Sequence, residues 1–181
     1  MQDDVFQFRR AVEGEIPAIR DMHAASVWRL CQADYSPAQI TAIVEQMGTM
    51  DDHVVHDRRL FIALAGQTIV GSAGWSTRPP GYALIGNGMA AHAGDGQPRI
   101  RSVFVHPDWT RRGLARRLMQ IAENEIAAAG WRTIELGATL TGVPLYQALG
   151  YVAAPRRAVL LPSGVAIPFV PMVKSLMREA A

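Results

Sequence analysis

The sequence predicts an α/β protein, built on one mixed, mostly antiparallel sheet with helices on both faces. The chain has 181 residues, of which 49% are hydrophobic and 19% charged, and this suits one domain with a sizeable core. Some strand-like runs form hairpin pairs, whereas helical segments separate others, so hairpins and crossovers are mixed. We expect the element order β-α-α-β-β-β-α-β-α-β-β, within a single domain over residues 1–181.

The first half of the chain supplies one strand, two helices and a hairpin. The run "VFQFRRAV" alternates as a strand does, and "EGEIPAIRDMHAASVWRLC" follows as a helix with Pro17 in its first turn. A second helix is predicted over "SPAQITAIVEQM", with Ser36 as N-cap and Pro37 at the first position. The run "RLFIALAGQTIVGSAGWS" then indicates two strands joined by a turn at Gly66-Gln67.

The second half begins with a connection rich in Gly and Pro over residues 78–98, followed by a strand, "RIRSVFVHP", that ends at Pro107. The segment "GLARRLMQIAENEIAAAG" has one apolar helical face and a stop at Gly130. A strand, "RTIELGATL", and a short helix, "VPLYQALG", come next, and Gly150 ends that helix. The last run, "RAVLLPSGVAIPFVPMVK", predicts a hairpin that turns at Ser163-Gly164.

Composition argues against several classes of function. The formal charge of +2 gives weak support for a dedicated nucleic-acid binder. Cys31 is the one cysteine, so neither an intramolecular disulfide nor a cysteine metal cluster is possible. The chain shows no apolar signal segment and no stretch near the roughly 20 apolar residues that span a membrane. We therefore expect a cytoplasmic protein with no metal, no nucleic acid and no membrane among its partners.

The loop before the third long helix, "TRRGLARR", places several arginines and one glycine at a helix start. Unpaired N–H groups at helix N-termini bind phosphate, and Gly113 lets the backbone approach an anion closely. Arg111, Arg112 and Arg116 oppose the helix dipole at a cost of about 0.3–1 kcal/mol each, which a bound anion would offset. An ordinary solvated helix start is the plain alternative. A nucleic-acid patch is another, but no aromatic stacking residues alternate with the arginines.

Two motifs resemble the signatures of the GNAT acetyltransferase superfamily. The run "VFVHPDWTRRGLARRLMQIAENEIAAAG" is similar to its central strand, Q/R-x-x-G-x-G/A loop and helix. The run "TGVPLYQALGYV" is similar to its second signature, written around F-Y-x-x-L-G-F. The element order, including the final hairpin, also matches, so the resemblance covers nearly the full chain.

The resemblance implies that the protein binds acetyl-coenzyme A as a cosubstrate. Backbone groups of Val103 and Val105 would pair with the pantetheine arm, and the N–H groups of residues 111–116 would hold the pyrophosphate. Thr110 departs from the family's Q/R position, and Ala115 fills the last position, as the pattern allows. The cofactor-binding residues implied are Val103, Phe104, Val105, Arg111, Arg112, Gly113, Leu114, Ala115, Arg116 and Thr139.

The resemblance also assigns the acid of the reaction. Tyr146 stands where the family's tyrosine protonates the departing thiolate, whereas Tyr151 stands at an aromatic packing position. Without a bulge, Arg99 and Arg101 would share one orientation with Val103 and Val105. The two arginines occupy positions where several relatives carry a base, which arginine cannot be. They would bind an acidic group of the acceptor, or they are surface arginines at a sheet edge.

The proton acceptor and the acceptor pocket stay open at this stage. Candidates for the base are His92, Asp95, His106, Glu135 and water. The substrate residues we expect are Arg99, Arg101, Trp28, Tyr82 and Glu135, with Tyr35 and Trp75 as further wall candidates. The function predicted is acetyl transfer to a small amine or an amino-acid-like acceptor by direct attack in a ternary complex, in a possible homodimer. The alternative is a non-catalytic coenzyme A-binding sensor or interaction module on the same fold.

Overall fold

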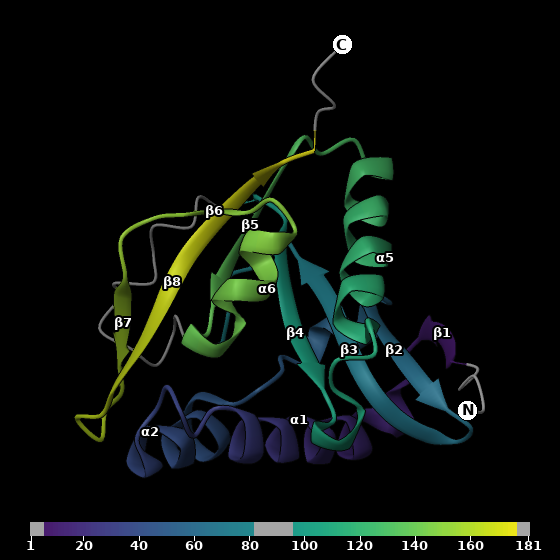
Figure 1. Ribbon diagram of the computed structural model, residues 1–181. Helices are drawn as coiled ribbons and strands as arrows, with labels where there is room; N and C mark the ends of the chain where they lie inside the picture. Colours follow the sequence, from purple (N-terminus) through teal and green to yellow (C-terminus); the bar gives the residue numbers. More distant parts are fainter. Residues whose placement is uncertain (1–5, 82–95, 177–181) are drawn as a thin grey trace.

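A mixed sheet with helices against both faces forms the framework of the protein (Figure 1). The structure is a computed structural model that describes residues 6–81 and 96–176. Within them the strands are β1 (Phe6–Arg10), β2 (Leu60–Ala65), β3 (Thr68–Ser76), β4 (Arg99–Val105), β5 (Thr133–Ala138), β6 (Val152–Ala153), β7 (Arg157–Leu160) and β8 (Ala166–Ser175). The helices are α1 (Ile16–Leu30), α2 (Pro37–Ala42), α3 (His53–His56), α5 (Leu114–Ala128) and α6 (Val143–Ala148). The short 3-10 helices are η1 (Glu13–Glu15), η3 (Pro107–Trp109) and η4 (Leu140–Gly142), and η2 (Ile43–Met47) is a π-helix that continues α2.

The strand order is β1-β2-β3-β4-β5-β8-β6, and β7 pairs with β8. Only β4 and β5 pair in parallel among these strands, so the predicted mixed, mostly antiparallel sheet is confirmed. The sequence did not indicate α3 or β6, because elements of four and two residues are too short to show a period. Most of the predicted 78–98 connection, residues 82–95, lies outside the described residues.

The predicted capping and turn residues act as their chemistry suggests. The Ser36 hydroxyl accepts a hydrogen bond from the Gln39 amide at 3.3 Å and so caps α2. Gly130 and Gly150 follow α5 and α6 with φ of 90° and 87°, a left-handed backbone that favours glycine. Among the helices within the described segments, none combines the length and the apolar character needed to cross a bilayer.

Successive residues of β3 show that α1 and α5 cover opposite faces of the sheet. A Cβ added to Gly71 would lie 3.0 Å from Leu118 Cδ1 of α5. The next residue, Ser72, points the other way, and its Oγ lies 2.7 Å from Nε2 of His23 in α1. The α5 face carries the largest hydrophobic cluster, while α1 and α2, along the bottom of the view in Figure 1, cover the other face.

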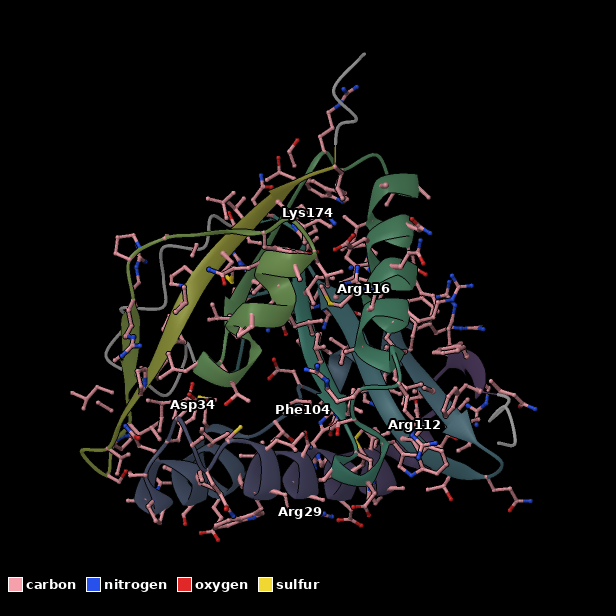
Figure 2. The ribbon with its side chains drawn as sticks, in the orientation of Figure 1. Arg29, Asp34, Phe104, Arg112, Arg116 and Lys174 are labelled. Carbon is pink, nitrogen blue, oxygen red and sulfur yellow. The ribbon has the colours of Figure 1, made fainter. Side chains whose placement is uncertain are left out.

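Two side chains, Tyr35 and Glu123, each make polar contacts with two residues that are distant in sequence. The Tyr35 hydroxyl, just beyond α1, donates to Pro168 O of β8 at 2.8 Å and accepts from the Leu140 amide of η4 at 2.9 Å. Burial raises the pKa of Tyr35 to about 12, so this hydroxyl keeps its proton. On the other face, Glu123 of α5 lies 2.6 Å from Nζ of Lys174 and accepts from the Tyr151 hydroxyl at 2.9 Å. Figure 2 shows Lys174 near the carboxyl end of β8.

The packing between β2 and β3 predicts that Gly74→Ala destabilises the protein by about 1–3 kcal/mol. An added Cβ would lie 2.8 Å from Leu60 Cδ1 and 3.0 Å from Arg59 O, and the backbone oxygen cannot move aside easily. Gly14→Ala is the matched control, because its Cβ would meet nothing within 4 Å. Urea unfolding of both variants checks the prediction; equal stability of the two would contradict it.

Candidate functional site

The site begins where β4 and β5 separate. In the part of the chain that the structure describes, Arg99 and Glu135 are the one residue pair in register between these strands. The Glu135 amide donates to Pro98 O at 3.1 Å beside that pair, and the strands diverge from there (Figure 1). A cavity of about 310 Å³ opens between them, lined by β4 on one side and by Leu136 and Gly137 of β5 on the other.

A β-bulge in β4 divides the strand into two differently oriented halves. Ser72 of β3 pairs with Phe104, and Gly74 pairs with Arg101, so two residues of β4, Ser102 and Val103, lie opposite one of β3. Ser102 has a φ of 53°, a left-handed value that is unusual for a residue with a side chain.

The bulge corrects the expectation that the arginines and valines of β4 share one orientation. Val103 and Val105 pack against the cluster on the α5 face. Arg101 points to the α1 face, where its Nη1 lies 3.1 Å from Asp51 Oδ2. The extra residue shifts the strand's alternation by one position, so side chains after the bulge change face.

The remaining walls of the cavity come from α1, from the segment between η2 and α3, and from α6. Among the wall residues are Val27 and Cys31 of α1, Met47 of η2 and Leu145 of α6. The predicted site residues that line the cavity are Arg99, Arg101, Val103, Phe104, Val105, Ala115, Thr139 and Tyr146. The cavity thus brings together residues from both motifs, which are far apart along the chain.

Both arginines of β4 form ion pairs, Arg99 as a buried residue and Arg101 as a partly buried one. Arg99 is 7% exposed, and its Nε lies 3.3 Å from Glu135 Oε2. Arg101 pairs with Asp51 and also donates to the Arg78 carbonyl oxygen. The alternative of surface arginines at a sheet edge is therefore wrong. β4 lies between β3 and β5 in the sheet, and both side chains are held in ion pairs with Glu135 and Asp51.

Asp51 is a cavity residue that sequence reasoning missed. It lies between η2 and α3, pairs with Arg101 and accepts a hydrogen bond from the Gly81 amide at 3.1 Å. Among the described residues that line the cavity, it is the one carboxylate. Its position depends on contacts with β4 and with the segment after β3, and no local pattern in "GTMDDHVVHD" signals such contacts.

The loop before α5 contains two positions with a left-handed backbone, a geometry that also occurs in anion-binding turns. Arg111 and Gly113 both have positive φ, 63° and 78°, and Gly113 immediately precedes the first residue of α5. Such turns point successive N–H groups to one side, and the helix N-terminus adds its unpaired amides. The Thr110 hydroxyl donates to Pro107 O at 3.2 Å, so its side chain serves the turn.

The side chains of this loop lie in different surroundings. Figure 2 shows Arg112 beside the start of α5, where its guanidinium stacks 4.6 Å from the Trp109 ring centroid. Leu114 is 2% exposed and packs in the core, so only its backbone is available to a ligand. Of the predicted loop residues, Ala115 lines the cavity, while Arg111, Arg112, Gly113 and Arg116 do not.

Tyr146 of α6 lines the cavity and is 8% exposed. Its ring meets that of Tyr151 edge-on, with centroids 5.9 Å apart. Burial raises the pKa of Tyr146, so the phenol stays protonated. A neutral phenol at a cavity wall can donate a hydrogen bond or a proton to a ligand atom that gains negative charge.

Several predicted residues do not line the cavity. Trp28 is 39% exposed, because it lies about 100° around α1 from Val27, which does line it. Glu135 is turned to its ion pair with Arg99, and His106 accepts from the Asp108 amide at 3.3 Å in the turn after β4. Trp75 and Tyr35 are buried in the cores on the two faces of the sheet. Tyr82, His92 and Asp95 lie outside the described residues.

The site combines two parallel strands that separate, a turn with left-handed backbone angles after the first strand and a buried tyrosine after the second. The sequence profile described as "Acetyltransferase (GNAT) domain" matches residues 31–176. The chain therefore belongs to the GNAT acetyltransferase family, as the two motifs predicted. No curated protein matches it in sequence.

Solved structures of low sequence identity share the fold. A GCN5-related N-acetyltransferase from Rhodopseudomonas palustris superposes with a TM-score of 0.75 at 22% identity, covering 97% of this chain and 99% of that one. The PaiA N-acetyltransferase from Thermoplasma acidophilum, in complex with coenzyme A, gives 0.66 at 11%, covering 94% and 99%. A polyamine N-acetyltransferase from Drosophila melanogaster, which forms N-acetylagmatine, gives 0.65 at 17%, covering 95% and 100%.

One histidine of α1 packs behind Phe104, a residue that lines the cavity. His23 is fully buried, and its ring stacks on that of Phe104, a cavity residue, with centroids 4.1 Å apart. Burial, with a smaller contribution from Arg20 on the same helix, lowers the pKa of His23 to about 3. The native protein therefore holds this imidazole neutral.

This burial predicts a loss of stability in weak acid. Below about pH 6.5 the unfolded chain binds a proton on His23 that the native state excludes, so His23 costs up to about 1.4 kcal/mol of unfolding free energy per pH unit. His23→Gln removes the titration but keeps an N–H donor. Urea unfolding between about pH 7 and 4.5 should show the wild type losing more stability than this variant, and parallel losses would contradict the prediction.

Proposed function

We propose that the protein transfers an acetyl group from acetyl-coenzyme A to the amine of a small molecule, by direct attack within a ternary complex. The observation that supports this best is the cavity itself. It has the backbone of β4 along one wall, Ala115 of α5 at one end, and Tyr146 with its raised pKa on another wall. These are the parts that a thioester donor, its pyrophosphate and its departing thiolate require.

The chain's own residues would divide the work between binding and proton transfer. The N–H groups of the loop over residues 111–116 would hold the pyrophosphate, and β4 would pair with the pantetheine arm. When bound, acetyl-coenzyme A supplies the activated acetyl group. Tyr146 would protonate the departing thiolate, because its phenol is neutral and lines the cavity.

The acceptor amine must lose a proton before or during attack. Glu135 and His106 do not line the cavity, and His92 and Asp95 lie outside the described residues. We infer that the amine passes its proton to water in the cavity. Asp51 is the carboxylate among the described lining residues to which that water could pass it on. A small amine acceptor agrees with the polyamine and agmatine acetyltransferases among the structural neighbours.

Cofactor binding is tested by thermal shift. Acetyl-coenzyme A should raise the melting temperature saturably, whereas ATP and an oligonucleotide should not, because a ligand that binds only the folded state stabilises it. Gly113→Ala should weaken binding about tenfold, or 1.4 kcal/mol, since Cβ strains the loop at φ 78°.

Gly130→Ala is the matched control for the loop variant. It has the same kind of strain, at φ 90°, but lies at the other end of α5. It should lose similar stability and keep the full ligand-induced shift. No shift of the wild type at millimolar acetyl-coenzyme A would refute the cofactor assignment.

The acid is tested by Tyr146→Phe. Removing the hydroxyl should lower kcat by about 10²–10⁴-fold with little change in coenzyme A affinity, because the proton is needed only as the thiolate leaves. Tyr151→Phe is the control: its hydroxyl bonds Glu123 and not the cavity, so this variant should lose stability and keep kcat. Steady-state kinetics and calorimetric titration measure both. A sensor without turnover predicts coenzyme A binding but no acetylated product with any amine.

A further inference from the structure

We propose that His23, acting through the Ser72 hydroxyl, is a positioning residue that fixes the bulge of β4 and thereby aims the Val103 amide into the cavity. The proposal rests on the proposed function, because the direction of this amide matters for catalysis only where a thioester carbonyl binds beside it. Neither residue touches the cavity: both are fully buried between α1 and the sheet.

The bulge needs support from its surroundings. A left-handed backbone is unfavourable for a residue with a side chain, and such conformations persist only where neighbouring structure imposes them. Ser102 adopts this conformation at φ 53°. The side chain of Ser102 makes a long hydrogen bond, 3.4 Å to Thr49 O, which is too weak to hold the backbone alone.

A buried chain of hydrogen bonds supplies that support. The Ser72 hydroxyl donates to Ser102 O at 2.6 Å. Since a hydroxyl has a single hydrogen, His23 Nε2, 2.7 Å from the same oxygen, must be the donor of the second bond. The His23 ring therefore carries its proton on Nε2, and its Nδ1, which has no hydrogen-bond partner among the described residues, is left with its lone pair. Water does not compete with these bonds, because both side chains are buried.

Fixing the Ser102 carbonyl also fixes the amide that follows it. In a trans peptide the C=O of one residue and the N–H of the next point in opposite directions, and the described chain contains no cis peptide. Ser102 O points toward β3, where Ser72 lies. The Val103 N–H consequently points away from β3, to the side on which β4 and β5 have separated. An amide held there is a ready donor for a carbonyl oxygen that gains negative charge.

His23 also holds the strand on the other side of the bulge. Its ring stacks on Phe104 at an interplanar angle of 30°, and Phe104 follows Val103 directly. One side chain of α1 therefore contacts Phe104 directly and reaches Ser102 through Ser72. Since Ser26 and Val27 of α1 line the cavity as well, the same helix sets both the wall and the direction of the Val103 amide.

The test compares three variants of the full chain. His23→Gln keeps an N–H donor near the place of Nε2, and His23→Leu removes it. His53→Leu is the matched control, because His53 makes the same kind of bond to a serine of β3, Nε2 to Ser76 Oγ at 3.0 Å, away from the bulge. The readouts are the NMR resonances of the Ser102 carbonyl and Val103 amide without ligand, the Kd of coenzyme A, and kcat with an amine acceptor.

We expect His23→Leu to move the Ser102 and Val103 resonances and to lower kcat about tenfold, with the Kd of coenzyme A changed less than about twofold. His23→Gln should restore both readouts, and His53→Leu should leave both resonances in place. Unmoved resonances in His23→Leu, or a His23→Gln variant as impaired as His23→Leu, would overturn the proposal. So would equal losses of affinity and kcat, which indicate a general structural defect.

A second variant and a comparison of two readouts complete the test. Should His23→Leu fail to fold, Ser72→Ala removes the donor to Ser102 O directly and must give the same resonance shifts and kcat loss. The ligand-free resonances test the bulge, whereas coenzyme A binding by the wild type tests the proposed function. Shifted resonances in a protein that does not bind coenzyme A would overturn the proposed function, and with it the catalytic part of the proposal, but not the support of the bulge.

Discussion

Within the described residues β4 pairs with β5 at one position, Arg99 opposite Glu135, and the arrangement of the site depends on this limited pairing. At this point the backbones are in register, and the side chains form an ion pair at 3.3 Å. Beyond it β5 continues beside β8, and the carboxyl ends of the two parallel strands lie apart. Because α5 follows one of these ends and α6 the other, both helices begin at the same opening, as ligand sites in α/β sheets commonly require.

The bulge then gives the two halves of β4 different tasks. Before it, Arg99 and Arg101 point to the α1 face and neutralise Glu135 and Asp51. After it, Val103 and Val105 pack toward α5. The acidic and basic groups are therefore kept on one face of the strand, while the face beneath α5 stays apolar. A regular strand would have placed arginines and valines on the same face.

Local chemistry made much of the fold predictable, whereas the details of the site depend on contacts distant in sequence. Ser36 indicates the start of a helix, and Gly130 and Gly150 indicate helix ends, because helix caps and left-handed turns favour these residue types. The Ser102 bulge has no such signal, because serine occurs in both turns and strands. Its left-handed φ depends on contacts with Ser72 of β3 and, through Ser72, with His23 of α1. The same limit hid Asp51, whose partner Arg101 lies on another element. Trp28 does not line the cavity although its neighbour Val27 does, because helical periodicity in a sequence predicts a buried face but not which residues of the helix face a cavity.

The contact between Lys174 and Glu123 has a chemical consequence under the proposed function, in which the protein binds an acylating agent. Lys174 is the chain's single lysine, and every other cationic side chain of fixed charge is an arginine. An ammonium engaged with a carboxylate at 2.6 Å offers no lone pair to a thioester, and guanidinium groups stay protonated. The surface can thus be basic enough to attract a polyanionic donor while exposing almost no bystander amine to self-acylation.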